Sequence, residues 1–252
     1  MKKTSIFITL LWLGLIAIAG PSVAETRLKV FAAASLRGVL DVLIEDFGKP
    51  VAVSYGGSGT MARQVAQGAP ADLVILANPT WDLWLSKNTA PAIDREPTLA
   101  SNGLVLIGGK DQAPFEATPD AKALLARLNG GRIAMGQRDS VPAGQYARAW
   151  LEQQEMWTEI SPHIAETQNV RMALTLVHRS EAPLGIVYLS DTYASDAVHV
   201  LWHIDPATHP SIQYPARALS PEGVELLDYL RTPSAKTVFA NHGFLPGQGT
   251  TN

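Results

Sequence analysis

Cysteine is absent from all 252 residues of the chain. Disulfide bonds, thiolate zinc sites and cysteine nucleophiles are therefore excluded. The fold must be stabilised by its hydrophobic core alone. The chain is long enough to bury such a core, either as one large domain or as two domains of about 110 residues each.

Basic residues are in the minority. The chain carries 20 Lys and Arg residues against 23 Asp and Glu residues, and loss of Lys2 and Lys3 with the leader described below leaves 18 against 23. Proteins that bind nucleic acid present a basic face, so we expect no nucleic-acid partner. The same net charge argues against long-range attraction of an anion, so any anion selectivity must come from short-range hydrogen bonds.

Long hydrophobic runs are missing except near the N-terminus. Lys2 and Lys3 precede an apolar stretch over residues 6–19, and Ser22-Val23-Ala24 follows as a small-x-small cleavage sequence. The stretch is shorter than the roughly 20 residues that span a bilayer. The pattern predicts a cleaved signal peptide over residues 1–24 and a soluble periplasmic protein, with a retained membrane anchor as the alternative.

Clusters of metal ligands are also lacking. His199 and His203 lie four residues apart, but on a predicted strand, which separates them by roughly 13 Å. The remaining histidines are isolated, and carboxylate pairs such as Glu45-Asp46 fall on predicted exposed helix faces. The sequence therefore predicts no cofactor and no resident metal ion.

Apolar runs alternate with helical patterns along the rest of the chain. This alternation is typical of parallel sheets built from right-handed crossovers, and it predicts an α/β fold. We expect strands over residues 28–33, 51–55, 72–76, 104–107, 132–135, 185–188, 198–201 and 212–216. We expect helices over residues 36–47, 60–67, 79–86, 121–128, 144–154, 170–179, 221–230 and 235–241.

Two lobes explain this order of elements better than one long sheet. Residues 25–103 with about 213–252 are predicted to form lobe 1, and about 104–212 to form lobe 2. Asn102-Gly103 and the segment 214–218 would then be the two strands of a hinge. Ligands of open α/β sheets bind beyond the carboxyl ends of the strands, which places a site in the cleft between the lobes.

Two serines occur where a predicted strand gives way to a helix. Ser35 follows the run 28–34, and Ser58 lies in the turn Gly56-Gly57-Ser58-Gly59-Thr60. A helix start offers free N–H groups, and glycines let such groups converge on an anion. Two such starts suggest one small, multiply charged anion held by neutral donors. The alternatives are a plain N-cap at Ser35 and an ordinary Gly-rich turn at Ser58.

The Gly-rich turn matches neither the phosphate-binding loop of nucleotide-binding proteins nor the Gly-x-Ser-x-Gly motif of serine hydrolases. It lacks the Gly-x-x-x-x-Gly-Lys-Ser/Thr pattern and no Lys lies within reach in sequence, so a nucleotide-phosphate loop is not expected. Thr60 stands where the second Gly of a Gly-x-Ser-x-Gly elbow would be, and no downstream Asp and His lie in a recognisable setting. A serine hydrolase that uses Ser58 remains an alternative.

Three further segments carry candidate donors. Pro142 and Gly144 flank Ala143 before a helix, so the Ala143 N–H is a candidate, although a plain helix start explains the same residues. Val170 follows the N-cap residue Asn169, so its N–H is a candidate. The neighbouring Arg171 is interpreted as a solvated surface residue, with contact to an anion as the alternative. Tyr188 ends a strand, where its hydroxyl either reaches a cleft or sits at the rim of the core.

These segments together resemble the periplasmic molybdate-binding proteins of ABC transporters. The resemblance extends over essentially the whole mature chain. One departure is visible, since glycines occupy the loop before Ser58, which is often serine-rich in that family. The matching segments are VFAAASL at 30–36, GSGTMARQ at 57–64, GAPADL at 68–73, VPAGQYA at 141–147, NVR at 169–171, APLGIVY at 182–188 and HGF at 242–244.

The resemblance implies a type II periplasmic-binding fold, with two lobes of mostly parallel sheet flanked by helices, and no enzymatic activity. Carried over position by position, the contacts to the anion fall on Ser35, Ser58, Ala143, Val170 and Tyr188. The implied ligand is molybdate or tungstate, with molybdenum bound only as the oxyanion. The implied partner is an inner-membrane ABC permease, and a monomer is expected. A binding protein for another oxyanion, such as sulfate, is the alternative.

Overall fold

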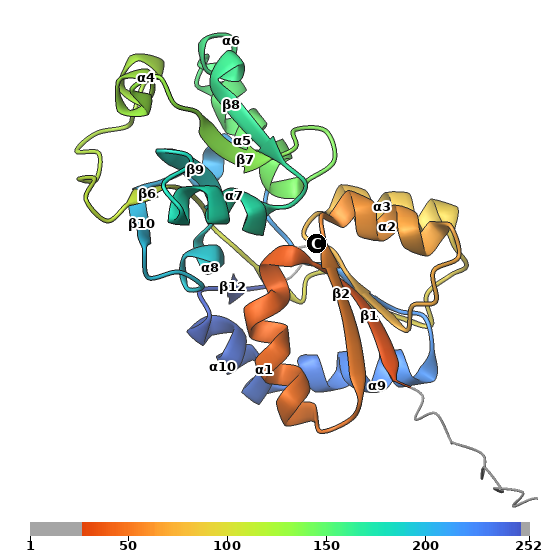
Figure 1. Cartoon of the computed structure of the whole chain (residues 1–252). Coiled ribbons are helices and arrows are strands. Elements are labelled where there is room, and N and C mark those ends of the chain that lie inside the picture. Colours follow the sequence, from red (N-terminus) through yellow and green to blue (C-terminus); the bar gives the residue numbers. More distant parts are fainter. Residues whose placement is uncertain (1–26, 248–252) are drawn as a thin grey trace, which may run out of the picture.

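The computed structural model describes residues 27–247, which form two α/β lobes joined by two crossing segments (Figure 1). One lobe contains β1, β2 and α1 and the other contains β6 to β10. The predicted signal peptide over residues 1–24 lies outside the described residues.

The sheet of the first lobe has the strand order β2-β1-β3-β11-β4. Alternate residues of β1 face opposite sides, as its period of two requires. Val30 packs with Leu40 of α1 in the larger core, whereas Phe31 packs with Met61 of α2 in a smaller one. The elements of this lobe are β1 (Leu28–Ala33), η1 (Ala34–Leu36), α1 (Arg37–Phe47), β2 (Val51–Gly56), α2 (Ser58–Ala66), β3 (Leu73–Ile75), α3 (Pro79–Asn88), β4 (Asp94–Glu96), β11 (Ala216–Ala218), α9 (Pro221–Leu230) and α10 (Pro233–Asn241).

The sheet of the second lobe has the order β10-β6-β9-β7-β8. Its central strand β9 is buried along its whole length, as expected for a strand covered on both faces. The elements of this lobe are β6 (Leu104–Gly109), α4 (Ala121–Leu128), β7 (Ile133–Gly136), α5 (Pro142–Gln153), α6 (Trp157–Ile160), η2 (Ser161–His163), β8 (Ile164–Thr167), α7 (Val170–His178), β9 (Leu184–Tyr188), α8 (Leu189–Thr192), β10 (Val198–His203) and η3 (Pro206–Thr208).

The two crossing segments pair with each other between the lobes. The backbone of Tyr214 bonds to both Leu99 and Ala100, each at 2.9 Å. The short strand β5 (Ala100–Ser101) precedes this crossing and pairs with β12 (Leu245–Pro246) near the end of the described chain. The two connections between the lobes therefore run side by side.

Each sheet is mixed, and its antiparallel share exceeds what the sequence predicted. In the first sheet β1 runs parallel to β2 and β3, but β11 runs antiparallel to β3 and β4. In the second sheet β6 runs antiparallel to β9 and β10. The antiparallel strands β6 and β11 are the ones that carry the chain between the lobes.

Several predicted boundaries were wrong by a few residues, and three of these bear on the site or on the crossing segments. The strand placed at 212–216 is Ala216–Ala218, because Pro215 lacks the N–H that a ladder needs. Helix α2 begins at Ser58 rather than at 60, and α5 begins at Pro142 rather than at 144. Both shifts bring a candidate residue into the first turn of its helix. The short strands β4, β5, β8 and β12 and the short helices α6 and α8 were not predicted.

A buried ion pair holds α3 against the edge of the first sheet. The side chain of Asp82 on α3 is 1% exposed and contacts the guanidinium of Arg217 on β11. A second guanidinium, that of Arg95 on β4, lies 2.6 Å from the same carboxylate. Arg217 is itself buried, so Asp82 supplies its counter-charge.

We expect Asp82→Ala to lower the free energy of unfolding by about 3–5 kcal/mol, because it leaves the Arg217 charge buried without a partner. Urea unfolding measures the change. The control is Asp228→Ala, which removes an exposed partner of Arg231 and should change stability by less than about 0.5 kcal/mol. Equal losses in the two variants would contradict this account.

Candidate functional site

A small cavity lies where the two lobes meet. The structure places all five residues that the sequence singled out on its wall: Ser35 and Ser58 from the first lobe, and Ala143, Val170 and Tyr188 from the second. Among the described residues that line it, none carries a charged side chain. The wall is made of small residues, helix starts and hydroxyl groups.

Neither serine caps its own helix, so the N-cap interpretation of Ser35 was wrong. The Ser35 Oγ lies 3.0 Å from the Tyr214 hydroxyl, and the Ser58 Oγ accepts the Ala77 N–H at 3.0 Å. Both side chains are buried. Tyr214 on the returning segment holds Ser35, and the backbone that follows β3 holds Ser58. Each serine lies in the first turn of a helix.

Several backbone N–H groups at the cavity have no acceptor among the described residues, and three of them stand at helix starts. These three belong to Ser58, Ala143 and Val170, which stand in the first turns of α2, α5 and α7. A helix cannot satisfy its own first N–H groups, and its dipole favours negative charge at the same end. Three helix N-termini from the two lobes thus present donors to one small space.

Tyr188 supplies a side-chain donor from the second lobe. It ends β9, is 1% exposed, and its hydroxyl has no hydrogen-bond partner among the described residues. Burial raises the pKa of this phenol well above its ordinary value, so the hydroxyl keeps its proton. A buried hydroxyl without a partner is costly, and a ligand oxygen at the cavity would satisfy it.

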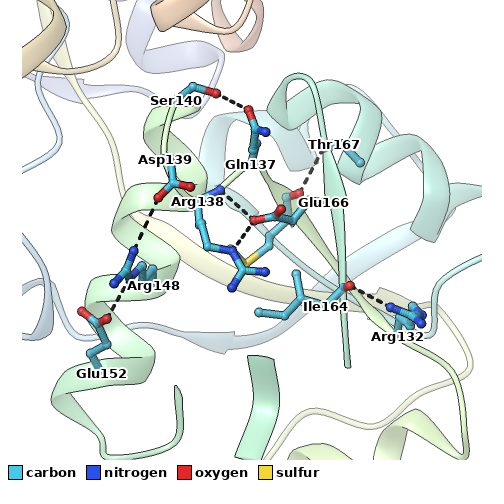
Figure 2. A network of polar contacts seen from close by, with 11 residues as sticks. Arg132, Gln137, Arg138, Asp139, Ser140, Arg148, Glu152, Ile164, Glu166 and Thr167 are labelled. Atoms are coloured by element: carbon cyan, nitrogen blue, oxygen red, sulfur yellow. Dashed lines mark hydrogen bonds and ion pairs between the residues drawn. The ribbon is translucent and has the colours of Figure 1, made fainter. Parts of the chain in front are cut away.

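Polar contacts hold the segments that lead into α5 and α7 (Figure 2). Arg138, in the loop before α5, donates to Glu166 of β8 through both its backbone N–H and its guanidinium, at 3.0 and 2.6 Å. The Gln137 N–H donates to the Thr167 carbonyl at 2.9 Å. The loop between β7 and α5 is therefore tied to the strand that leads into α7, which fixes the spacing of the two helix starts.

The lobes touch across the cavity. The Gly59 N–H donates to the Ser140 carbonyl at 3.3 Å, and Asn78 donates to Gln145 at 3.1 Å. A Cβ added at Gly57 would lie 2.7 Å from the Gln168 carbonyl oxygen. The glycines around Ser58 thus permit the close approach of the second lobe, which no larger residue would allow.

Arg171 is not the solvated surface residue that the sequence suggested. Its side chain is 20% exposed, its Nε lies 2.8 Å from the Asp191 carboxylate, and its Nη2 donates to the Ser35 carbonyl at 3.1 Å. Asp191 is fully buried and also accepts the Tyr188 N–H at 3.1 Å. The pair lies behind the cavity wall, where it connects two candidate donors from opposite lobes.

Sequence reasoning missed Asp191, Asn102 and Tyr214 as neighbours of the site. Asp191 follows the Tyr188 strand by three residues, which is the spacing of a carboxylate that returns to the start of a helix. Asn102 and Tyr214 were assigned to the hinge only. Tyr214 contacts Ser35 and Asn102 contacts Tyr214, and both contacts depend on how the two crossing segments pair, which no local pattern reveals.

The surroundings of Ser58 do not support a nucleophile. Among the described residues that line the cavity, none is a histidine or a carboxylate that could act as a base. Within residues 27–247 there is also no group of three or more side chains placed to hold a metal ion. The arrangement is suited to binding an acceptor-rich anion.

Comparison with known proteins gives one consistent result. The family model described as bacterial extracellular solute-binding protein matches residues 28–245. The molybdate-binding protein ModA of Escherichia coli is 38% identical over 90% of this chain and 93% of its own length. The corresponding protein of Haemophilus influenzae is 33% identical over 88% and 91%. The solved periplasmic molybdate-binding protein of Azotobacter vinelandii, at 22% identity, superposes with a TM-score of 0.75 over 88% of this chain and 100% of its own.

Titration of Asp191 gives a test of the buried pair. Burial raises the pKa of Asp191 to about 6, and Arg171 and the Tyr188 N–H oppose this only in part. Between this pKa and the ordinary value of about 3.9, the folded state keeps a proton that the unfolded chain has lost. The contribution of Asp191 to stability should therefore rise as the pH falls from 7 to 4.

The measurement compares the free energy of unfolding of the wild type with that of Asp191→Asn at each pH. The difference should move in favour of the wild type as the pH is lowered. A parallel series with Asp111→Asn, at an exposed site, corrects for the general change in net charge. A difference that instead grows with rising pH would show that the Arg171 charge, rather than burial, dominates at Asp191.

Proposed function

Because this chain belongs to the family of bacterial extracellular solute-binding proteins, we propose that it captures molybdate, and tungstate about equally well, in the cavity between its lobes. The proposal rests above all on one observation. Hydroxyl and N–H donors from both lobes converge on a small cavity whose described lining carries no charged side chain. The relatives named as molybdate-binding proteins agree with this ligand.

The donors match what a fully ionised tetrahedral oxyanion needs. Such an ion offers acceptors on every side, and we assign its contacts to Ser35, Ser58, Ala143, Val170 and Tyr188. Hydrogen bonds to a charged group contribute about 1.5–3 kcal/mol each. Three helix N-termini add partial positive charge without the need to desolvate a Lys or Arg.

Selectivity follows from size and protonation. Sulfate has the same charge and shape with shorter bonds, so it cannot reach all donors of a cavity built for a larger ion. Phosphate carries a proton at neutral pH, and its O–H would find no carboxylate among the assigned residues. An unpaired donor inside a closed cavity is costly, so phosphate is rejected.

The role in the cell follows from the family. The family is one of solute-binding transport proteins and not of enzymes, and its description places it outside the cytoplasm. We propose further that the protein is a periplasmic monomer, which delivers its ligand to an inner-membrane ABC permease and catalyses no reaction. Of the helices in the described part of the chain, none is long and apolar enough to cross a membrane.

The domain assignment enters the same proposal. Lobe 1 would comprise residues 25–103 and about 213–252, and lobe 2 about 104–212, with the crossing segments as the hinge between them. The anion bridges donors from both lobes, so it binds the closed arrangement better than an open one and shifts the equilibrium toward closure.

Thermal shift with a series of anions tests the ligand. Molybdate and tungstate should raise the unfolding midpoint of the purified protein in proportion to the logarithm of their concentration. Sulfate should act weakly and phosphate hardly at all. A larger shift with sulfate than with molybdate would assign the protein to another oxyanion, and no shift with any of them would end the proposal.

Substitution of Ser58 tests the site. Ser58→Ala removes a hydroxyl donor and should weaken molybdate binding by about 1–3 kcal/mol, as measured by calorimetric titration. The matched control is Ser86→Ala on the exposed part of α3, where the hydroxyl bonds only to the Leu83 carbonyl. Unchanged affinity in Ser58→Ala would remove this residue from the site.

A further inference from the structure

A buried hydrogen-bond chain runs from the hinge to the cavity. It begins at Asn102 on the first crossing segment, whose side-chain oxygen accepts the N–H groups of Gly103 at 3.0 Å and Ser190 at 3.3 Å. Two backbone donors on one amide oxygen fix the orientation of the amide. The Asn102 NH₂ group must therefore face its other neighbours, the Ser190 Oγ at 2.7 Å and the Tyr214 hydroxyl at 3.1 Å.

The second member of the chain is Tyr214, on the returning segment. Its side chain is completely buried, and its hydroxyl has two partners among the described residues, the Asn102 NH₂ group and the Ser35 Oγ. The NH₂ group can only donate. The phenol proton is therefore left unpaired unless it is given to Ser35, and a buried unpaired donor is strongly disfavoured.

This assignment fixes the role of Ser35. Its Oγ accepts the phenol proton, and its own proton has no other recorded partner within the described chain. Since Ser35 lines the cavity, the free proton is directed there. Ser58 is arranged in the same way by a different neighbour, because its Oγ accepts the Ala77 N–H and its proton is likewise free.

We propose that Asn102 and Tyr214 are positioning residues that make Ser35 a hydrogen-bond donor toward the bound anion, and that they thereby help the cavity to reject anions that carry their own proton. The proposal rests on the function proposed above and deepens it. With Tyr214 in place, the phenol proton occupies one accepting side of Ser35. Without it, the serine hydroxyl can rotate and accept an O–H from a protonated anion.

The residues of this hydrogen-bond chain come from different parts of the fold. Asn102 and Tyr214 lie on the two crossing segments, and Ser190 belongs to the second lobe. Ser35, by contrast, stands at the end of β1 in the first lobe. The second lobe therefore reaches these groups through the contacts of Ser190 with Asn102.

A double-mutant cycle tests the proposal, with molybdate titrated calorimetrically into wild type, Tyr214→Phe, Ser35→Ala and the double variant. Tyr214→Phe should weaken molybdate binding about five- to twentyfold in the wild-type background and less than about twofold in the Ser35→Ala background. Competition by phosphate at pH 7.5 supplies the second readout. Tyr214→Phe should narrow the preference for molybdate over phosphate by about tenfold, an effect that a merely structural loss would not produce.

The control is Tyr229→Phe, which removes a phenol hydroxyl that bonds to Asp46 far from the cavity. It should leave both molybdate affinity and the phosphate preference unchanged. Unfolding midpoints without anion report any general loss of stability in each variant. Equal weakening by Tyr214→Phe in both backgrounds, or an unchanged phosphate preference, would overturn the positioning role.

Two results separate this proposal from the proposed function. If the wild type gives no heat with molybdate or tungstate, the proposed function is disproved, and the positioning role is disproved with it. If the wild type binds molybdate but the cycle shows no coupling between Tyr214 and Ser35, only the positioning role is disproved.

A measurement on the wild type covers the case in which Tyr214→Phe does not fold. In protein with isotope-labelled tyrosine, the Tyr214 hydroxyl proton should exchange slowly and show a nuclear Overhauser effect to the β-protons of Ser35. A proton directed to Asn102 instead would overturn the assignment.

Discussion

The constraint on which this structure depends is that the polar atoms at the interlobe cavity are donors with their protons turned inward. The Tyr188 hydroxyl has no partner among the described residues, and the serine oxygens are already occupied by other donors. Such groups are stable in water but costly when the lobes exclude it. A ligand that accepts hydrogen bonds on all sides removes this cost, and a ligand that brings its own donor does not. Closure and selectivity are therefore two consequences of the same arrangement.

Charge is kept one layer away from the cavity. Arg171 lies close to the candidate donors, but its guanidinium does not face the cavity. It pairs with the buried Asp191 and donates to the Ser35 carbonyl. The Arg171–Asp191 ion pair has no net charge, so it can position Ser35 and Tyr188 without adding a large electric field at the cavity. A bare guanidinium in the wall would attract any anion, including smaller and protonated ones. Dipoles of fixed direction, by contrast, distinguish anions by where their acceptor atoms lie.

Strand and helix periodicity were sufficient to predict most elements, whereas the family resemblance was needed to assign the five candidate residues to one site. What could not be predicted has physical reasons. The strand β8 contains Glu166 and β4 reads Asp94-Arg95-Glu96, so neither shows the apolar run by which buried strands are recognised. The starts of α2 and α5 were set two residues late because glycine and proline were interpreted as turn residues. The burial of Arg171 depends on Asp191, twenty residues away and in another element, which no local pattern encodes.

Direct contacts between the lobes add a further term to the affinity. The bonds from Gly59 to Ser140 and from Asn78 to Gln145 join residues that do not line the cavity. They stabilise the closed arrangement by an amount that is independent of which anion binds. The apparent affinity of a ligand that binds only the closed form is its intrinsic affinity multiplied by the closed fraction. These contacts therefore scale the affinity for all anions together, whereas the donors of the cavity set the ratios between them. Affinity and selectivity can thus change separately in this fold, since they rest on different residues.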